Sequence, residues 1–215
     1  MISCGQFRPG VSSLCHLILV NGRRSLTNAT KYHHSLDTFL RYAKHHGLPV
    51  HTTYYVGTVY EYVVLDSLTK SARMSLEHSG GTGDNGVDLR GTMSTYKFEK
   101  KIPVVVQCKY EQKKPGARLL RELEGSLVNA NPDTLAVLAT PLPVTSAGKR
   151  VLASSDKAIA FCLILGYEEG GVATQMIWNS TADKLLRGLR VASVYRETTV
   201  DGKMMTVRSM SLIDT

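Results

Sequence analysis

Polar residues of the kinds that hold a divalent metal ion gather in one stretch of the sequence, Gly80–Tyr110. The stretch begins with the glycine-rich segment GGTGDNGVDLRG, which contains Asp84 and Asp88, and it ends with IPVVVQCKY, which carries Gln107 and Lys109. Carboxylate and amide oxygens are suitable ligands for Mg²⁺. A lysine ammonium can stabilise the charge that builds on a phosphate. These residue types indicate metal-dependent hydrolysis of a phosphodiester.

A strand must present Gln107 and Lys109 together. Residues 102–109 form a nearly continuous valine-rich run, which is typical of an internal strand covered by helices. Side chains alternate along a strand, so Gln107 and Lys109 should project to one face while Cys108 projects into the core. Asp88 stands at the end of another predicted strand and can reach the same place if the two strands are neighbours.

The glycine-rich loop is expected to support this site. Glycines such as Gly83 and Gly86 allow positive φ, so the loop can bend sharply and approach a phosphate closely. Asp84 lies within the loop. We expect Asp88 to be the first ligand of Mg²⁺ or Mn²⁺ and the side-chain carbonyl of Gln107 the second, with the backbone and water completing the shell.

A further acid, Glu61, precedes the loop. Apolar residues recur at three and four positions over residues 52–70, which favours a helix, although the Tyr and Val content would equally suit a strand. Glu61 is the only carboxylate in a band of Val and Tyr on that helix, where an acid needs a partner. It is expected to bind the metal ion or act as a base. Alternatively, it pairs with a basic residue such as Arg73.

The remaining segments predict an α/β sandwich, in which helices cover a central sheet. Pro115 near the start of its segment, and leucines at helical spacing after it, identify the clearest helix. Asp201 and Gly202 form a turn signal between two alternating segments, which predicts a C-terminal hairpin. Helices are predicted over residues 34–46, 52–70, 115–130, 146–154 and 181–189. Strands are predicted over 73–78, 102–109, 135–140, 158–165, 172–178 and 204–209, and a further strand is predicted to start at 87–89.

The N-terminal segment has the composition of a mitochondrial transit peptide. Residues 1–36 contain Arg8, Arg23, Arg24 and Lys31 and no Asp or Glu, with many Ser, Thr and Asn residues. A secretory signal is disfavoured because the arginine pair follows the apolar stretch, and a basic tail is the other alternative. We therefore predict a transit peptide over residues 1–34 and one domain over residues 35–215, with the mitochondrial matrix as its location.

Charge and composition limit the classes of partner. The net charge is +8, and no apolar run approaches the roughly 18 residues of a membrane span. Basic residues are dense between Lys97 and Arg121, which places Lys113, Lys114 and Arg118 as candidate contacts to a nucleic acid. The four cysteines fit neither a zinc site nor a disulfide framework. His78 is expected to be a surface residue.

The segments GDNGVDL and VVVQCKY together resemble the Mrr-type branch of the PD-(D/E)xK, or restriction-endonuclease-like, superfamily. With its transit-like N-terminus, the chain is similar to the fungal mitochondrial "required for respiratory growth" proteins, over about residues 56–165. The resemblance implies a restriction-endonuclease-like sandwich with a central mixed sheet flanked by helices, its core over about 52–165 and a C-terminal extension over 166–215. It assigns Glu61 as the acid of the first helix, Asp88 as the motif acid, Gln107 at the Glu/Gln position and Lys109 as the motif lysine. Gln107 departs from the commoner glutamate and removes a negative charge from the metal site.

Two functions from different classes follow from this resemblance. The first is a metal-dependent endonuclease that acts on mitochondrial nucleic acid, DNA rather than RNA, and supports genome maintenance and respiratory growth. The second is a catalytically weak or inactive nucleic-acid-binding protein on the same fold. A matrix protein with no nucleic-acid role is a third option. A homodimer would suit an enzyme that cuts both strands of a duplex.

Overall fold

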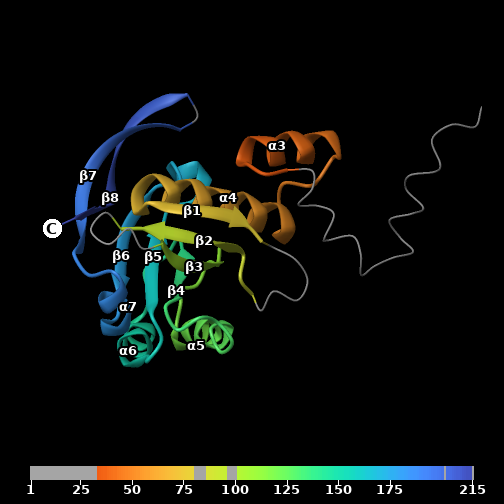
Figure 1. Cartoon of the computed structure of the whole chain (residues 1–215). Coiled ribbons are helices and arrows are strands. Elements are labelled where there is room, and N and C mark those ends of the chain that lie inside the picture. Colours follow the sequence, from red (N-terminus) through yellow and green to blue (C-terminus); the bar gives the residue numbers. More distant parts are fainter. Residues whose placement is uncertain (1–32, 80–85, 96–100, 201, 215) are drawn as a thin grey trace, which may run out of the picture.

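A six-stranded mixed sheet forms the centre of the protein in a computed structural model, which describes residues 33–79, 86–95, 101–200 and 202–214 (Figure 1). The first three strands are antiparallel neighbours, the third to the fifth run parallel, and the sixth is antiparallel to the fifth. In spatial order, which is also sequence order, the strands are β1 (Met74–His78), β2 (Leu89–Ser94), β3 (Lys101–Cys108), β4 (Leu135–Thr140), β5 (Ile159–Ile164) and β6 (Ala173–Trp178).

Helices cover both faces of this sheet. Helix α4 (Thr53–Ala72) lies on one face, and α5 (Ala117–Ser126) and α6 (Ser146–Ser154) lie together on the other (Figure 1). Helix α3 (Leu36–His45) packs on α4 through Phe39, which is fully buried beside Tyr62. A short 3-10 helix, η1 (Tyr167–Glu169), and helix α7 (Ser180–Leu185) flank β6 in the chain.

Alternation along β3 builds two separate cores. Val104 and Val106 pack with α4 residues, including Leu68, in what we call the α4-side core. Val105 packs with α5 residues, including Leu120, on the opposite face. Both faces of β3 are therefore buried, as its valine-rich sequence predicts.

Helix α4 begins and ends at residues that explain its position. The Thr52 side chain accepts a hydrogen bond from the Tyr55 N–H (3.2 Å), which caps the helix. Arg73 follows the helix in a left-handed conformation (φ 55°) and turns the chain directly into β1. The helical alternative for residues 52–70 is thus confirmed over the strand alternative. None of the helices in the described ranges is long and apolar enough to cross a bilayer.

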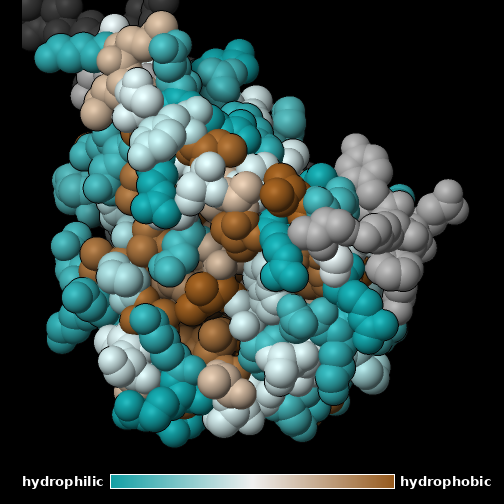
Figure 2. Space-filling view, turned by 90° about the vertical axis from the view of Figure 1, so that its left-hand side faces the viewer, coloured by the Kyte–Doolittle hydropathy of each residue, from teal (hydrophilic) through white to brown (hydrophobic). Residues whose placement is uncertain are grey.

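A long hairpin of β7 (Leu189–Val200) and β8 (Lys203–Asp214) completes the described chain. Met210 and Leu212 bury its base in the α4-side core, while Tyr195 in the middle of β7 and Met204 near the tip are 75% and 71% exposed. Figure 2 shows apolar side chains interrupting the polar surface on the side of the molecule where this hairpin lies. The hairpin predicted from the Asp-Gly signal is confirmed, although its strands are longer than predicted.

Two predicted helices are too long. Residues 127–130 leave α5 and continue as tight turns, in which the Val128 N–H bonds to the Gly125 carbonyl (3.3 Å). Helix α7 ends at Leu185, and Leu189 is the first residue of β7. Burial of Leu189 in the α4-side core overrides the helical spacing of its segment.

Candidate active site

Asp88 lies immediately before β2, and its carboxylate is fixed at the end of β3. Its backbone N–H donates to the Val106 carbonyl (2.9 Å), which joins it to the sheet. The Cys108 backbone N–H donates to Asp88 Oδ2 at 2.7 Å. This bond links two segments 20 residues apart and brings the predicted motif acid to the end of the strand that leads to Lys109.

Gln107 is the polar residue that the packing of β3 leaves incompletely bonded. It is 6% exposed, and its Oε1 has no hydrogen-bond partner among the described residues. Gly86 lies against it: a Cβ on Gly86 would stand 3.0 Å from Gln107 Nε2, and Gly86 has φ +76°. The positive φ and the close approach of Gln107 both favour glycine at that position. Gly83 and Asp84, the other predicted loop residues, lie outside the described residues.

Three charged residues of the predicted site shift the pKa of one thiol, that of Cys108. Burial raises the pKa of the Cys108 thiol well above its usual range, the carboxylates of Asp88 and Glu61 raise it further, and the ammonium of Lys109 lowers it. Cys108 itself packs against the α4-side core, as predicted. Glu61 of α4, Asp88 before β2 and Lys109 after β3 are therefore all close enough to Cys108 to shift the pKa of its thiol.

Glu61 has a partner other than the one suggested by the sequence. Its Oε2 lies 2.5 Å from Nε2 of His78, at the end of β1. Arg73, the suggested partner, instead pairs with Asp214 at 2.5 Å because the base of β8 lies beside the end of α4. The pairing of Glu61 with Arg73 and the surface location of His78 are both wrong, since the His78 side chain is only 12% exposed.

Sequence reasoning missed His78 as part of this neighbourhood. The available signal was Glu61 itself, an acid in an apolar helix that required a partner. Packing of α4 against β1 brings the two residues together across 17 positions of sequence, and no local pattern predicts that contact.

The candidate nucleic-acid contacts lie at the surface. Lys113 and Lys114 are exposed in the segment between β3 and α5. Arg118 pairs with Glu122 one helical turn later (2.6 Å), and both side chains are exposed. Solvent and salt screen such a pair, so Arg118 can exchange it for a phosphate.

The available donors fit a hard divalent cation. Within the described ranges, no three His, Cys, Asp or Glu side chains are grouped as a metal site. A metal ion here would therefore need oxygen from an amide, the backbone or water in addition to carboxylates. The buried, unpaired Oε1 of Gln107 is such an oxygen.

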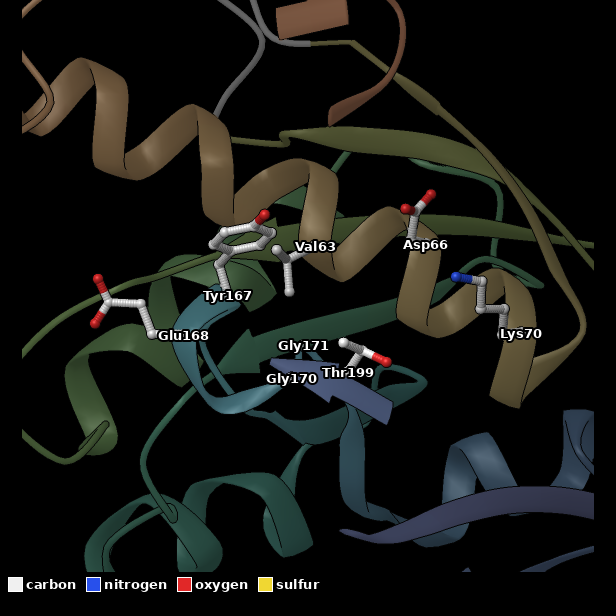
Figure 3. A pocket seen from close by; sticks show the side chains of 8 residues that line it. All are labelled: Val63, Asp66, Lys70, Tyr167, Glu168, Gly170, Gly171 and Thr199. Atoms are coloured by element: carbon white, nitrogen blue, oxygen red, sulfur yellow. The ribbon is translucent and has the colours of Figure 1, made fainter. Parts of the chain in front are cut away.

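A separate cavity of about 170 Å³ lies between α4, η1 and β7 (Figure 3). Asp66 and Lys70 stand one turn apart on α4, and Val63 packs closely against Gly171. None of the predicted site residues lines this cavity, which is bounded by Val63, Asp66, Lys70, Tyr167, Glu168, Gly170, Gly171 and Thr199. It takes no part in the chemistry argued for Asp88.

The structure defines an α/β protein whose central strand β3 ends beside the Asp88 carboxylate, with Gln107 buried on that strand and Lys109 directly after it. The family model described as Required for respiratory growth protein 7 matches residues 52–102 and 93–195 of the chain. The chain belongs to this family.

Named relatives agree with this membership. The Schizosaccharomyces pombe protein named "Uncharacterized protein C824.03c, mitochondrial" is 35% identical over 179 residues, which covers 81% of this chain and 71% of that protein. The Saccharomyces cerevisiae protein "Required for respiratory growth protein 7, mitochondrial" is 38% identical over 72 residues, 33% of this chain and 26% of that protein. No solved structure matches the chain. The names of both relatives confirm the predicted mitochondrial location, whereas the predicted transit peptide falls almost wholly on residues 1–32, outside the described ranges.

Proposed function

We propose that this protein is a metal-dependent nuclease with a restriction-endonuclease-like fold, acting on mitochondrial nucleic acid in support of respiratory growth. The observation that carries the proposal is the electrostatic effect of Glu61, Asp88 and Lys109 on Cys108, whose backbone N–H donates to Asp88 Oδ2 at 2.7 Å. Gln107, the preceding residue of β3, has a buried Oε1 with no hydrogen-bond partner among the described residues. The order of a helix, three antiparallel strands, a helix and a parallel strand supports the fold assignment.

The residues divide the chemistry of phosphodiester hydrolysis among them. Asp88, Gln107 and Glu61 would hold a Mg²⁺ or Mn²⁺ ion, which when bound supplies positive charge against the phosphate and acidifies water. Lys109 has no ion-pair partner among the described residues, so its ammonium can stabilise the charge that builds on the phosphate. The bond from the Cys108 N–H orients the Asp88 carboxylate before any ligand arrives.

The basic segment after β3 would receive the nucleic acid. Lys113 and Lys114 are exposed a few residues beyond Lys109, so a polyanion bound at the site can follow this segment. DNA is the proposed substrate in preference to RNA, and a homodimer would provide two sites for the two strands of a duplex.

The alternative is a nucleic-acid-binding protein with weak or no catalysis. Gln107 favours it, because an amide holds a divalent cation less strongly than the carboxylate at that position in the commoner superfamily pattern. The exposed Lys113 and Lys114 would serve binding equally well.

Incubation of the full chain with circular duplex DNA and Mg²⁺ or Mn²⁺ separates these functions. We expect the wild type to nick or linearise the circle. Asp88→Asn and Lys109→Ala should each lower the cleavage rate by about 100-fold or more, because the first removes a carboxylate that would hold the metal ion and the second removes the ammonium that would stabilise charge on the phosphate. The control is Asp156→Asn, which removes an exposed acid whose neighbour Lys157 is 4.0 Å away in the turn before β5. It should cleave like the wild type.

Two outcomes would contradict the proposed nuclease activity. If the wild type cleaved neither DNA nor RNA while binding persisted in Asp88→Ala and Lys109→Ala, the binding protein would be the correct function. If the chain had no measurable affinity for either nucleic acid at low salt, both functions would be wrong.

A further inference from the structure

The carboxylate of Glu61 is held from behind by His78. His78 Nε2 lies 2.5 Å from Glu61 Oε2, and the two side chains are only 12% and 20% exposed. No described residue forms a hydrogen bond with the other oxygen, Oε1. His78 thus engages one oxygen of Glu61 and leaves the other without a described partner, and the carboxylate lies near enough to Cys108 to raise the pKa of its thiol.

The ring of His78 is itself fixed. It stacks on Tyr62, with ring centroids 5.2 Å apart and planes 20° apart. The Tyr62 hydroxyl lies 2.7 Å from Nδ1 of His33 and donates to the His33 carbonyl at 3.0 Å. His33 packs edge-on against Phe39 of α3, with centroids 4.9 Å apart. We call His33, Tyr62 and His78 the aromatic platform.

The aromatic platform lowers the entropic cost of holding the Glu61 carboxylate in one position. A glutamate side chain has three rotatable bonds, and fixing them costs conformational entropy each time the carboxylate is needed at one place. A hydrogen bond from a ring that cannot rotate removes that cost before a ligand binds. Groups that orient a metal ligand in this way typically change metal affinity by about 10- to 100-fold when they are removed.

We propose that His78 is a positioning residue that aims Oε1 of Glu61 at the cation of the candidate active site, and that Tyr62 and His33, the other members of the aromatic platform, hold His78 in place. The inference rests on the proposed function, since it assigns a role toward the same metal site. His78 touches neither the phosphate nor the ion, and it acts only through Glu61.

Two substitutions separate the hydrogen bond of His78 to Glu61 from the stacking of its ring on Tyr62. His78→Phe keeps a ring that can stack on Tyr62 but has no donor for Glu61, whereas His78→Gln keeps a donor near the position of Nε2 but has no ring. His51→Phe is the matched control, because His51 is exposed in the turn before α4. Mn²⁺ affinity of the full chain, measured by electron paramagnetic resonance, does not depend on cleavage.

We expect His78→Phe to bind Mn²⁺ about tenfold more weakly than the wild type, with His78→Gln within about threefold of it. His51→Phe should bind like the wild type. Where cleavage is measured, His78→Phe should raise the Mn²⁺ concentration needed for half-maximal rate more than it lowers the maximal rate. Tyr62→Phe, which removes the two hydrogen bonds to His33 and keeps the ring, should weaken Mn²⁺ binding less than His78→Phe does.

The outcomes distinguish this inference from the proposed function. If Glu61→Gln and Asp88→Asn weakened Mn²⁺ binding while His78→Phe bound normally, the positioning role would be wrong and the metal site would stand. If neither Glu61→Gln nor Asp88→Asn changed the affinity, the site itself would be wrong, and both proposals would fall. If His78→Phe failed to fold, equal binding by the wild type and His78→Ala would overturn the positioning role.

Discussion

At the scale of single residues, Gln107 combines burial with an unpaired oxygen. A polar atom left without a hydrogen bond inside a protein costs about 1–3 kcal/mol. The two ends of the Gln107 amide differ, because Oε1 has no described partner while Nε2 faces Gly86. A cation would satisfy that oxygen, so the stability of the metal-free protein is lowered by the same atom that the proposed function requires.

Gln107→Met tests whether the unpaired oxygen lowers the stability of the metal-free protein. Methionine has nearly the shape of glutamine and no polar oxygen, so the metal-free variant should be more stable by about 1–2 kcal/mol in denaturant unfolding. The increase in melting temperature that Mn²⁺ gives the wild type should shrink in the variant. The control is Gln175→Met on β6, where the side chain is exposed, and it should change stability by less than about 0.5 kcal/mol. A less stable Gln107→Met would mean that Oε1 is satisfied in the folded protein.

At the scale of elements, the contact between β1 and β2 depends on one glycine. Gly91 of β2 stands opposite Leu76 of β1 in the antiparallel register. A Cβ at Gly91 would lie 1.9 Å from the Ser75 carbonyl oxygen and 2.9 Å from the Leu76 Cα. Backbone atoms cannot yield as a flexible side chain can, so any larger residue must push β1 away from β2.

Gly91→Ala should therefore destabilise the protein by about 3 kcal/mol or more, measured as the free energy of unfolding in urea. Gly57→Ala on α4 is a matched control, since no atom lies within 4 Å of the added Cβ. That change should stabilise the protein by about 0.5–1 kcal/mol through the better helix propensity of alanine. Equal effects at the two positions would contradict the close packing of β1 on β2.

The elements themselves could be predicted from the sequence where local signals are strong. β4 and α6 have the predicted bounds, because β4 is apolar throughout and Thr145 caps α6. Contacts between distant segments could not be predicted. The bond between Glu61 and His78 depends on how α4 lies across β1, and the bond between Asp88 and Cys108 depends on the register of β2 with β3.

At the scale of the whole molecule, His33 joins the start of the described chain to α4. It is 3% exposed, two residues before the predicted start of the domain, and both its backbone and its ring bond to Tyr62. The predicted boundary between residues 34 and 35 therefore separates His33 from the packing to which it belongs. The fold includes at least this residue of the segment assigned to the transit peptide.

Burial makes His33 a source of pH dependence. Burial lowers the pKa of His33 from its usual value of 6.5, and the neighbouring His78 and His34 lower it further. Tyr62 and Tyr42 also face its ring, with Glu61 behind His78.

Because the unfolded chain binds a proton at His33 more readily than the folded chain does, the stability due to neutral His33 is complete above about pH 6.5. It falls as the pH drops below that value. His33→Phe keeps ring contacts with Phe39 and leaves the His33 backbone carbonyl for Tyr62, but it cannot bind a proton. Unfolding free energies measured in urea from about pH 8 to about pH 5 should fall less steeply in this variant than in the wild type, and His51→Phe, which alters an exposed histidine, should follow the wild type. A His33→Phe profile parallel to that of the wild type would mean that His33 has the same pKa in the folded and unfolded chains, and the packing of the first described residue on α4 would then be incorrect.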